Sequence, residues 1–174
     1  MALSAPERLS DAHDLSQFSC GKPSLDNWLR SRALSNQQKG FTVVMVVHDA
    51  GRVVGCYGLA PTAVVPASLP RSVRTGQPPD PVPCLLLGQL ATDLNWLGKG
   101  IGTGLLKHAL QRCVEGAALI GVRALIVNAI DEDAMAFWLR CGFQSSKDDP
   151  MVLSRSILDI AASLEQSALR DSAL

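Results

Sequence analysis

The stretch Leu97-Gly98-Lys99-Gly100-Ile101-Gly102-Thr103-Gly104 is the main guide to this fold, because a glycine occupies every second position. It follows a continuously apolar run, which predicts a central strand over Cys84–Leu94, and precedes an amphipathic helix predicted over Gly102–Glu115. Glycines let backbone N–H groups approach an anion closely and take positive φ angles. The start of the following helix adds unpaired N–H groups and the positive end of its dipole. The turn therefore predicts a phosphate or pyrophosphate site.

Two common nucleotide motifs are excluded by the spacing of these glycines. A P-loop requires Lys followed by Ser or Thr after the glycines, and no such pair follows here. A dinucleotide fingerprint of the G-x-G-x-x-G type requires Gly at position 103 or 105, where the chain has Thr103 and Leu105. A tight strand-to-helix turn that binds nothing is the remaining alternative.

Composition indicates one globular domain over residues 1–174, with 47% hydrophobic and 18% charged residues and a net charge of zero. The longest apolar run, Phe41–Val47, is too short for a membrane helix. No signal peptide is expected, so we predict a cytoplasmic protein that does not bind a membrane. The five cysteines are scattered without a C-x-x-C pair, which predicts reduced thiols and no metal site.

The remaining patterns predict alternating helices and strands. They indicate a helix from Ser24 to Gly40, a hairpin of Phe41–Val47 and Arg52–Leu59 around Gly51, and a long irregular arm over Pro61–Pro83. A buried strand over Arg123–Ala129 precedes a helix capped by Asp131 and closed by Gly142, a strand over Met151–Leu153 and a helix over Ile157–Leu169. This order predicts an α/β fold around a mixed sheet.

The strand, G-x-G-x-G turn and helix resemble the pyrophosphate site of the GNAT superfamily of acyl-CoA-dependent N-acyltransferases. In its usual pattern, Q/R-x-x-G-x-G/A, Gly100 and Gly102 match and Leu97 replaces Gln or Arg. Further blocks resemble GNAT-type toxins of bacterial toxin–antitoxin pairs, the TacT and AtaT group; they are Phe18–Gly21, Leu25–Leu29, Leu87–Asp93, the Leu69–Pro83 arm and Ala136–Phe143. The resemblance covers about residues 7–155, followed by a helical tail over 156–174. It implies a mixed central sheet flanked by helices, with splayed central strands.

The resemblance also implies acetyl-CoA as co-substrate. Backbone groups of Leu90, Ala91 and Thr92 would bond the pantetheine arm, and the Leu90 N–H would polarise the thioester carbonyl. The pyrophosphate would be held by residues of the turn, namely Gly98, Lys99, Gly100, Gly102 and Thr103. Asn128 and Phe137 would border the far side of the arm, although Leu90 and Phe137 are also compatible with plain core packing.

Trp138 stands where related toxins carry a catalytic Tyr in F-Y-x-x-x-G-F, and the only tyrosine is Tyr57, on another predicted strand. An indole cannot act as the acid that protonates the leaving thiolate. Two accounts remain open. Acyl transfer could persist at a lower rate, with water or a thiol such as Cys141 as the proton donor, or the protein could bind acyl-CoA with little chemistry.

For these toxins the acceptor is the α-amine of an aminoacyl-tRNA, and its acetylation blocks translation. Candidate contacts to tRNA are the basic side chains of the first helix and the proline-rich arm, together with the Gln that replaces a frequent Arg; they are Arg30, Arg32, Lys39, Arg71, Arg74 and Gln89. An ordinary solvated face is the alternative reading of these charges. The resemblance further implies a ribbon-helix-helix antitoxin and a possible homodimer. Acetylation of a small-molecule or protein amine is the alternative activity.

Overall fold

The computed structural model of the protein describes residues 2–173, and the chain divides into two compact units. The first unit consists of Met1–Ala60 and Leu87–Ala109, and the second of Pro61–Leu86 and Leu110–Leu174. Strand β4 (Val82–Thr92) and helix α4 (Ile101–Ile120) contribute residues to both units. No described helix has the length and apolar character needed to cross a membrane.

Seven strands form one mixed sheet in the order β1-β2-β3-β4-β5-β7-β6. Strands β4 and β5 run parallel, whereas β2 and β3, and β5 and β7, run antiparallel. The other strands are β1 (Glu7–Arg8), β2 (Val43–Asp49), β3 (Arg52–Val64), β5 (Ala124–Asn128), β6 (Gln144–Ser145) and β7 (Val152–Ser156). The prediction of an α/β fold around a mixed sheet is therefore confirmed.

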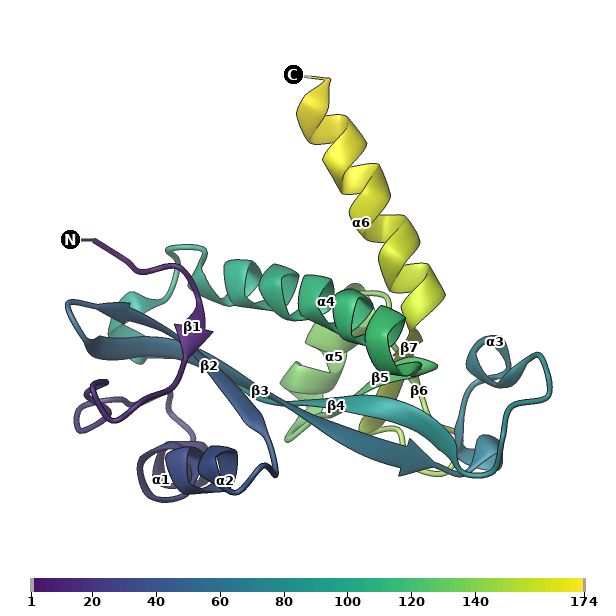
Figure 1. The fold of residues 1–174 in the computed structure, drawn as a ribbon, viewed down its shortest axis with the longest axis horizontal. Helices are drawn as coiled ribbons and strands as arrows, with labels where there is room; N and C mark the ends of the chain where they lie inside the picture. The colour runs from purple at the N-terminus through teal and green to yellow at the C-terminus, as the bar shows by residue number, and fades with distance from the viewer. Residues whose placement is uncertain (1, 174) are drawn as a thin grey trace. The chain divides into compact units, whose positions relative to one another are not determined.

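In the first unit, helices α1 (Pro23–Ser31) and α2 (Ala33–Gln38) lie on one face of β2 and β3, and the start of α4 lies on the other (Figure 1). The single helix predicted from Ser24 to Gly40 was wrong in two respects. It starts earlier, because Pro23 suits the first helical position. It also breaks at Arg32, whose φ of −129° is not helical.

The predicted hairpin is confirmed, with Val43 opposite Leu59 and Asp49 opposite Arg52. Gly51 has a φ of +89°, as the tight turn requires. Strand β3 is longer than predicted and continues through Val64. The buried face of the hairpin packs against α1 and α2 through a core of Leu9, Phe18, Leu29, Ala33, Val44, Val46, Val53 and Cys56.

The arm over Pro61–Pro83 is more regular than predicted. After the extension of β3, it forms a 3₁₀ turn over Pro66–Ser68 and a short helix α3 (Arg71–Arg74). Arg123 fixes the arm, because its Nε donates to the Val73 carbonyl at 2.7 Å and its Nη2 to the Thr75 carbonyl at 2.9 Å. Prolines are compatible with this course, since they suit the first positions of helices and turns.

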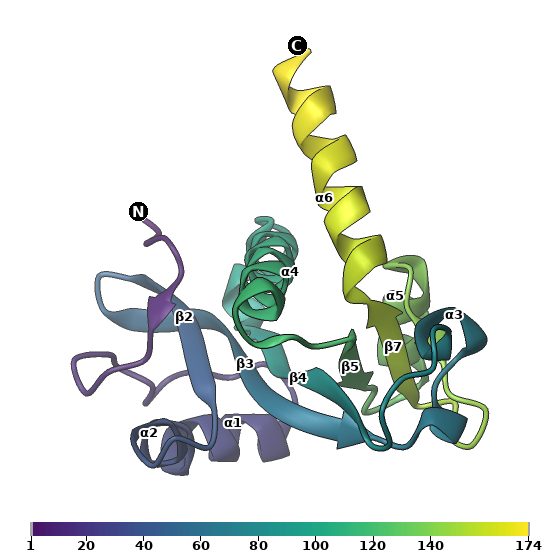
Figure 2. The same ribbon diagram turned by 45° about the vertical axis from the view of Figure 1, so that its right-hand side comes forward.

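The second unit also contains helix α5 (Glu132–Arg140), whose predicted ends are confirmed. The Asp131 carboxylate accepts the Ala134 N–H at 2.8 Å, and Gly142 has a φ of +88°. Helix α6 (Ile157–Ser172) runs longer than predicted and projects from the end of β7 (Figure 2). Its side chains from 165 to 172 are all exposed.

Candidate functional site

The glycine-rich turn of the first unit has the backbone geometry of an anion site. Gly98 and Gly100 have φ angles of +76° and +79°, and a Cβ on either would have no heavy atom within 4 Å. The Gly104 N–H bonds the Gly100 carbonyl at 3.0 Å, so the N–H groups of residues 101–103 precede the first intrahelical bond of α4. An anion at this end can therefore meet backbone donors and the positive end of a 20-residue helix dipole.

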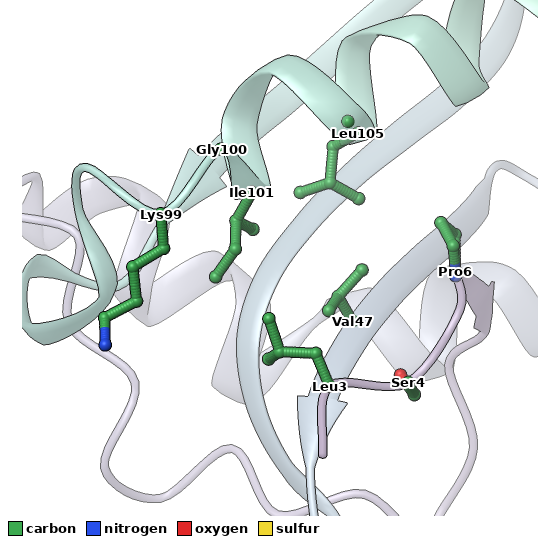
Figure 3. Close-up of a pocket in the computed structure, with 9 residues that line it drawn as sticks. Leu3, Ser4, Pro6, Val47, Lys99, Gly100, Ile101 and Leu105 are labelled. Atoms are coloured by element: carbon green, nitrogen blue, oxygen red, sulfur yellow. The ribbon is translucent and has the colours of Figure 1, made fainter. Parts of the chain in front are cut away.

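A hollow of about 210 Å³ lies beside the turn (Figure 3). The N-terminal segment around Leu3 and Pro6 forms one wall, Ile101 and Leu105 of α4 form the other, and Val47 of β2 lies between them. Because these walls are apolar, an anion would be held by the N–H groups of the turn at the rim, and the hollow itself suits an apolar group.

Lys99 keeps its ammonium group near the turn without entering that hollow. Its side chain extends away from the apolar lining (Figure 3), and its Nζ lies 5.2 Å from the centroid of the Trp96 ring. This cation–π contact orients an exposed positive charge beside Gly98 and Gly100. Thr103, in the first turn of α4, adds an exposed hydroxyl.

Strand β4 carries a backbone distortion at Gln89, whose φ is +60°. The other non-glycine residues with positive φ in the described chain, Ala50 and Gln77, lie outside strands. A side chain in this region of φ is strained and is found mostly where the surroundings fix it, often at functional sites. The half-buried residues that follow, from Leu90 to Thr92, are those predicted to bond the pantetheine arm.

Two buried carboxylates, Asp93 and Asp26, hold the Phe18–Gly21 block in place. Asp93, only 1% exposed, accepts the N–H groups of Ser19 at 3.1 Å and Asn95 at 2.9 Å. Asp26 accepts the N–H of Cys20 at 2.9 Å. The Asp93 bond ties the Phe18–Gly21 block to the end of β4, and the Asp26 bond ties the same block to α1. Sequence reasoning did not assign either carboxylate a role, although Asp before a short helix is a typical cap.

The basic candidates of the first unit differ in their availability. The Arg30 guanidinium donates to the Phe18 carbonyl at 2.6 Å and to the Asn27 side chain at 3.3 Å, so it has a structural role. Arg32 and Lys39 are exposed. In the second unit, Arg71 and Arg74 lie on α3, with Arg71 exposed and Arg74 half-buried.

The second unit contains the other predicted site residues. Trp138 is 7% exposed and packs edge-on against Phe137 and Phe143, with ring centroids 5.0 and 5.1 Å apart. The indole therefore belongs to an aromatic cluster in which Phe137 is 36% exposed. Asn128 is exposed at the end of β5, opposite Val152.

All five cysteines are free thiols in the structure. Burial raises the pKa of every one of them, to about 11 for Cys20 and to about 12 for Cys56 and Cys113. Cys141, at the end of α5, is half-buried and also has a raised pKa, caused mainly by burial. It is a thiol at neutral pH, the form that can give up a proton.

Glu7, His13 and His48 form a cluster that sequence reasoning missed, with ligand-type atoms all within 4.8 Å of one another. Both Nε2 atoms contact Oε1 of Glu7, at 2.7 Å from His13 and 3.0 Å from His48. Each Nδ1 accepts a backbone N–H, from Ser10 at 2.9 Å and Gly51 at 3.0 Å. A metal on Nε2 would require the ring proton on Nδ1, facing those N–H donors. The hydrogen bonds thus favour two Nε2–H tautomers that clamp one carboxylate.

Tyr57 is buried in the first unit, and its hydroxyl lies 2.7 Å from Nδ1 of His108 on α4. Sequence reasoning excluded Tyr57 from the predicted acid position because it lies on a different strand. The structure places Tyr57 on β3, as predicted, and shows the His108 imidazole as the partner of its hydroxyl.

The first unit contains a strand with a left-handed distortion, a glycine turn and a helix N-terminus, in that order along the chain. A model of the acetyltransferase (GNAT) family matches residues 9–143. The chain belongs to this GNAT family. The resemblance predicted from the glycine turn and its flanking blocks is therefore confirmed.

Relatives of this GNAT chain point to one group within the family. A tRNA-acetylating toxin of Mycobacterium tuberculosis (strain ATCC 25618 / H37Rv) is 45% identical over 159 residues, which cover 91% of this chain and 95% of the relative. The structure of AtaT complexed with acetyl-methionyl-tRNAfMet superposes with a TM-score of 0.85 at 25% identity, covering 94% and 99% of the two chains. AtaTR bound with AcCoA gives a TM-score of 0.80 at 25% identity, covering 93% and 98%.

Proposed function

We propose that this protein is an acetyl-CoA-dependent N-acetyltransferase that acetylates the α-amine of an aminoacyl-tRNA, as the toxin of a toxin–antitoxin pair. The observation that carries the acetyl-CoA part is the turn at Gly98–Gly104, which presents backbone N–H groups and a helix N-terminus in open space. The acceptor is supported by the 45% identity with a tRNA-acetylating toxin over 91% of the chain. Such a substrate implies a cytoplasmic protein.

Acetyl-CoA fits the backbone of the first unit. The pyrophosphate would be bound by N–H groups of Gly98 to Thr103, with the Lys99 ammonium group neutralising part of its charge. Backbone groups of Leu90, Ala91 and Thr92 would pair with the amides of the pantetheine arm, as an added strand would. Asn128 and Phe137 of the second unit are proposed to border the arm. Both units would then act as one acyltransferase domain.

The proposed reaction is direct transfer. The neutral α-amine attacks the thioester carbonyl carbon, and negative charge develops on the carbonyl oxygen, which the Leu90 N–H would stabilise. The C–S bond then breaks and CoA leaves as a thiolate, while the protonated nitrogen of the new amide gives its extra proton to water. Positioning of the two reactants supplies much of the rate enhancement and needs no acid side chain.

Protonation of the leaving thiolate is the step at which this chain differs from the GNAT-type toxins that it resembles. Trp138 has no acidic proton, and its ring is packed among Phe137 and Phe143. We propose that water or the half-buried thiol of Cys141 protonates the thiolate, and that Cys141, when it is the donor, regains its proton from water. A positioned acid contributes about 10²–10⁴-fold, so we expect transfer that is slower than with a phenol in place.

The test is transfer of labelled acetyl groups from acetyl-CoA to purified, charged tRNA. We expect label in the tRNA fraction, and hydrolysis of the ester should release an N-acetylated amino acid that mass spectrometry identifies. Uncharged tRNA and tRNA charged with an N-blocked amino acid are the controls. Labelling of free amines or proteins but not of charged tRNA would support the alternative acceptors.

A second measurement separates catalysis from binding. Calorimetry should show association with coenzyme A, because the turn alone supplies the phosphate contacts. Binding without transfer to any amine would favour the alternative of an acyl-CoA-binding module. No heat at millimolar coenzyme A would contradict both the enzyme and the binding module.

We also propose an antitoxin of the ribbon-helix-helix class and a homodimer, as the likeness to GNAT-type toxins implies. Co-expression with the neighbouring open reading frame tests the first. We expect it to relieve growth arrest and to co-purify with the protein. Sedimentation of the purified protein alone tests the second.

A further inference from the structure

The peptide group between Gln89 and Leu90 is held by a side chain from the neighbouring strand. The thiol of Cys56, on β3, donates to the Gln89 carbonyl oxygen at an Sγ–O distance of 3.3 Å. In a trans peptide group the C=O and N–H bonds point in opposite directions. A contact that directs the Gln89 carbonyl toward Cys56 therefore directs the Leu90 N–H away from it.

This orientation needs a fixed partner because Gln89 has a φ of +60°. A left-handed residue within a strand is strained and turns its peptide group out of the regular ladder. The ladder is anchored on one side of the distortion, where the Asp93 N–H donates to the Val54 carbonyl at 2.8 Å. The thiol of Cys56 supplies a donor at the distortion itself, so the part-buried Gln89 carbonyl keeps a hydrogen bond.

Cys56 is well suited to this task. It is 2% exposed and packs in the core with Leu29, Val44 and Val46, which hold its side chain in place. Burial raises the pKa of its thiol to about 12, so the thiol is protonated and can donate throughout the neutral range. The same burial makes a role as a nucleophile or redox group unfavourable.

We propose that Cys56 is a positioning residue for acyl transfer, whose thiol aims the Leu90 N–H at the thioester carbonyl by holding the peptide group between Gln89 and Leu90. The inference rests on the proposed function, because it takes the Leu90 N–H as the donor to the developing oxyanion. Cys56 itself touches neither the amine nor acetyl-CoA. Cys56 therefore contributes to the stability of the transition state, in which negative charge develops on the thioester carbonyl oxygen.

The kinetic test compares Cys56→Val, which fills the space without a donor, with Cys56→Ser, which keeps one. Complete loss of an oxyanion donor costs about 10²–10³-fold in kcat, so misdirection of one in Cys56→Val should cost about tenfold or more. We expect the KM for acetyl-CoA to change by less than about threefold, and Cys56→Ser to stay within about threefold of the unchanged protein in kcat. Cys113→Val, at another fully buried cysteine, is the matched control and should leave kcat unchanged.

A structural readout keeps the inference testable whatever the activity. The infrared difference spectrum between the unchanged protein and Cys56→Ser should show an S–H stretch at lower frequency than a free thiol. If the unchanged protein transfers no acetyl group, the proposed function fails, whereas this band still reports the thiol contact. Equal loss of kcat in Cys56→Ser and Cys56→Val would overturn the inference in favour of packing. An unshifted S–H band, or full activity of Cys56→Val, would also overturn it.

Discussion

The Asp93 carboxylate accepts the backbone N–H of Ser19 at 3.1 Å, across 74 positions of sequence. A second hydrogen bond joins the same two segments, from the Leu94 N–H to the Ser19 carbonyl at 2.9 Å. Together these contacts fasten the end of β4 to the segment that precedes α1. The glycine turn starts only a few residues later, so its position depends on this attachment.

Replacement of Asp93 should therefore destabilise the protein. Asp93→Ala leaves the N–H groups of Ser19 and Asn95 without their acceptor, and each hydrogen bond to a charged group contributes about 1.5–3 kcal/mol. We expect a loss of about 2–4 kcal/mol in the free energy of unfolding, measured by urea denaturation. Asp93→Asn retains one acceptor oxygen and should lose about half as much. Equal stability of Asp93→Ala and the unchanged protein would show that the contact contributes nothing.

A side chain in the glycine turn should weaken coenzyme A binding. Gly100→Ala places a Cβ on a residue with a φ of +79°, which costs about 1–2 kcal/mol and displaces the N–H groups of the turn. We expect the Kd for coenzyme A, measured by calorimetry, to rise about tenfold or more. Gly116→Ala is the matched control, because a Cβ there meets nothing within 4 Å and lies mid-helix in α4. It should raise stability by about 0.5–1 kcal/mol and leave the Kd unchanged.

A phenol at position 138 should accelerate acyl transfer. Trp138→Tyr restores the acid that related toxins carry, and a positioned acid is worth about 10²–10⁴-fold, so we expect kcat to rise about tenfold or more even with imperfect placement. Trp138→Phe makes the same change in size without the hydroxyl and is the control. If Tyr and Phe gave the same kcat, the leaving group would be protonated by another route that the ring does not affect.

The exposed basic residues of the first unit should contribute to tRNA affinity through charge. Arg32→Gln and Lys39→Gln should each weaken binding and reduce the slope of log K against log salt by about 1. Fluorescence anisotropy with labelled tRNA at several salt concentrations measures both. Arg30→Gln provides the contrast: its guanidinium bonds the Phe18 carbonyl at 2.6 Å, so it should lower the melting temperature. Unchanged salt slopes for Arg32 and Lys39 would place tRNA elsewhere.

The hydrogen bonds of His13 and His48 to Glu7 predict that the stability of the protein depends on pH at acidic values. Hydrogen bonds from His13 and then His48 lower the pKa of the Glu7 carboxyl below its ordinary value of 4.5. Because the pKa is lower in the folded chain, the stabilisation is present above pH 4.5 and is lost as the pH falls through the folded pKa. An NMR titration of the Glu7 carboxyl carbon should give a midpoint below 4.5.

The Glu7→Gln variant tests whether that clamp holds the N-terminal segment. It removes the charge, so the amide of Ser4, which bonds the His48 carbonyl at 2.9 Å, should exchange faster at neutral pH. Below the folded pKa of Glu7 the two proteins should exchange at similar rates. A Glu7 midpoint at or above 4.5 would contradict the clamp.

The sequence by itself determined the features that depend on short-range order. Two runs rich in β-forming residues predicted the hairpin around Gly51, and the caps Asp131 and Gly142 predicted the ends of α5. The alternating glycines predicted the turn ahead of α4. In each case the residue type limits the local backbone, through missing side chains, capping oxygens or β-branched side chains, so neighbours in sequence carry the information.

Only the tertiary structure decided which residues distant in sequence meet. No local signal predicts a left-handed Gln89, because that conformation is unfavourable for glutamine and is held by Cys56 from the adjacent strand. No local signal predicts the contact of Ser19 with Asp93, or that of Glu7 with His48. These pairs depend on strand register and on the packing of distant segments, which bring two polar groups together only after the chain has folded.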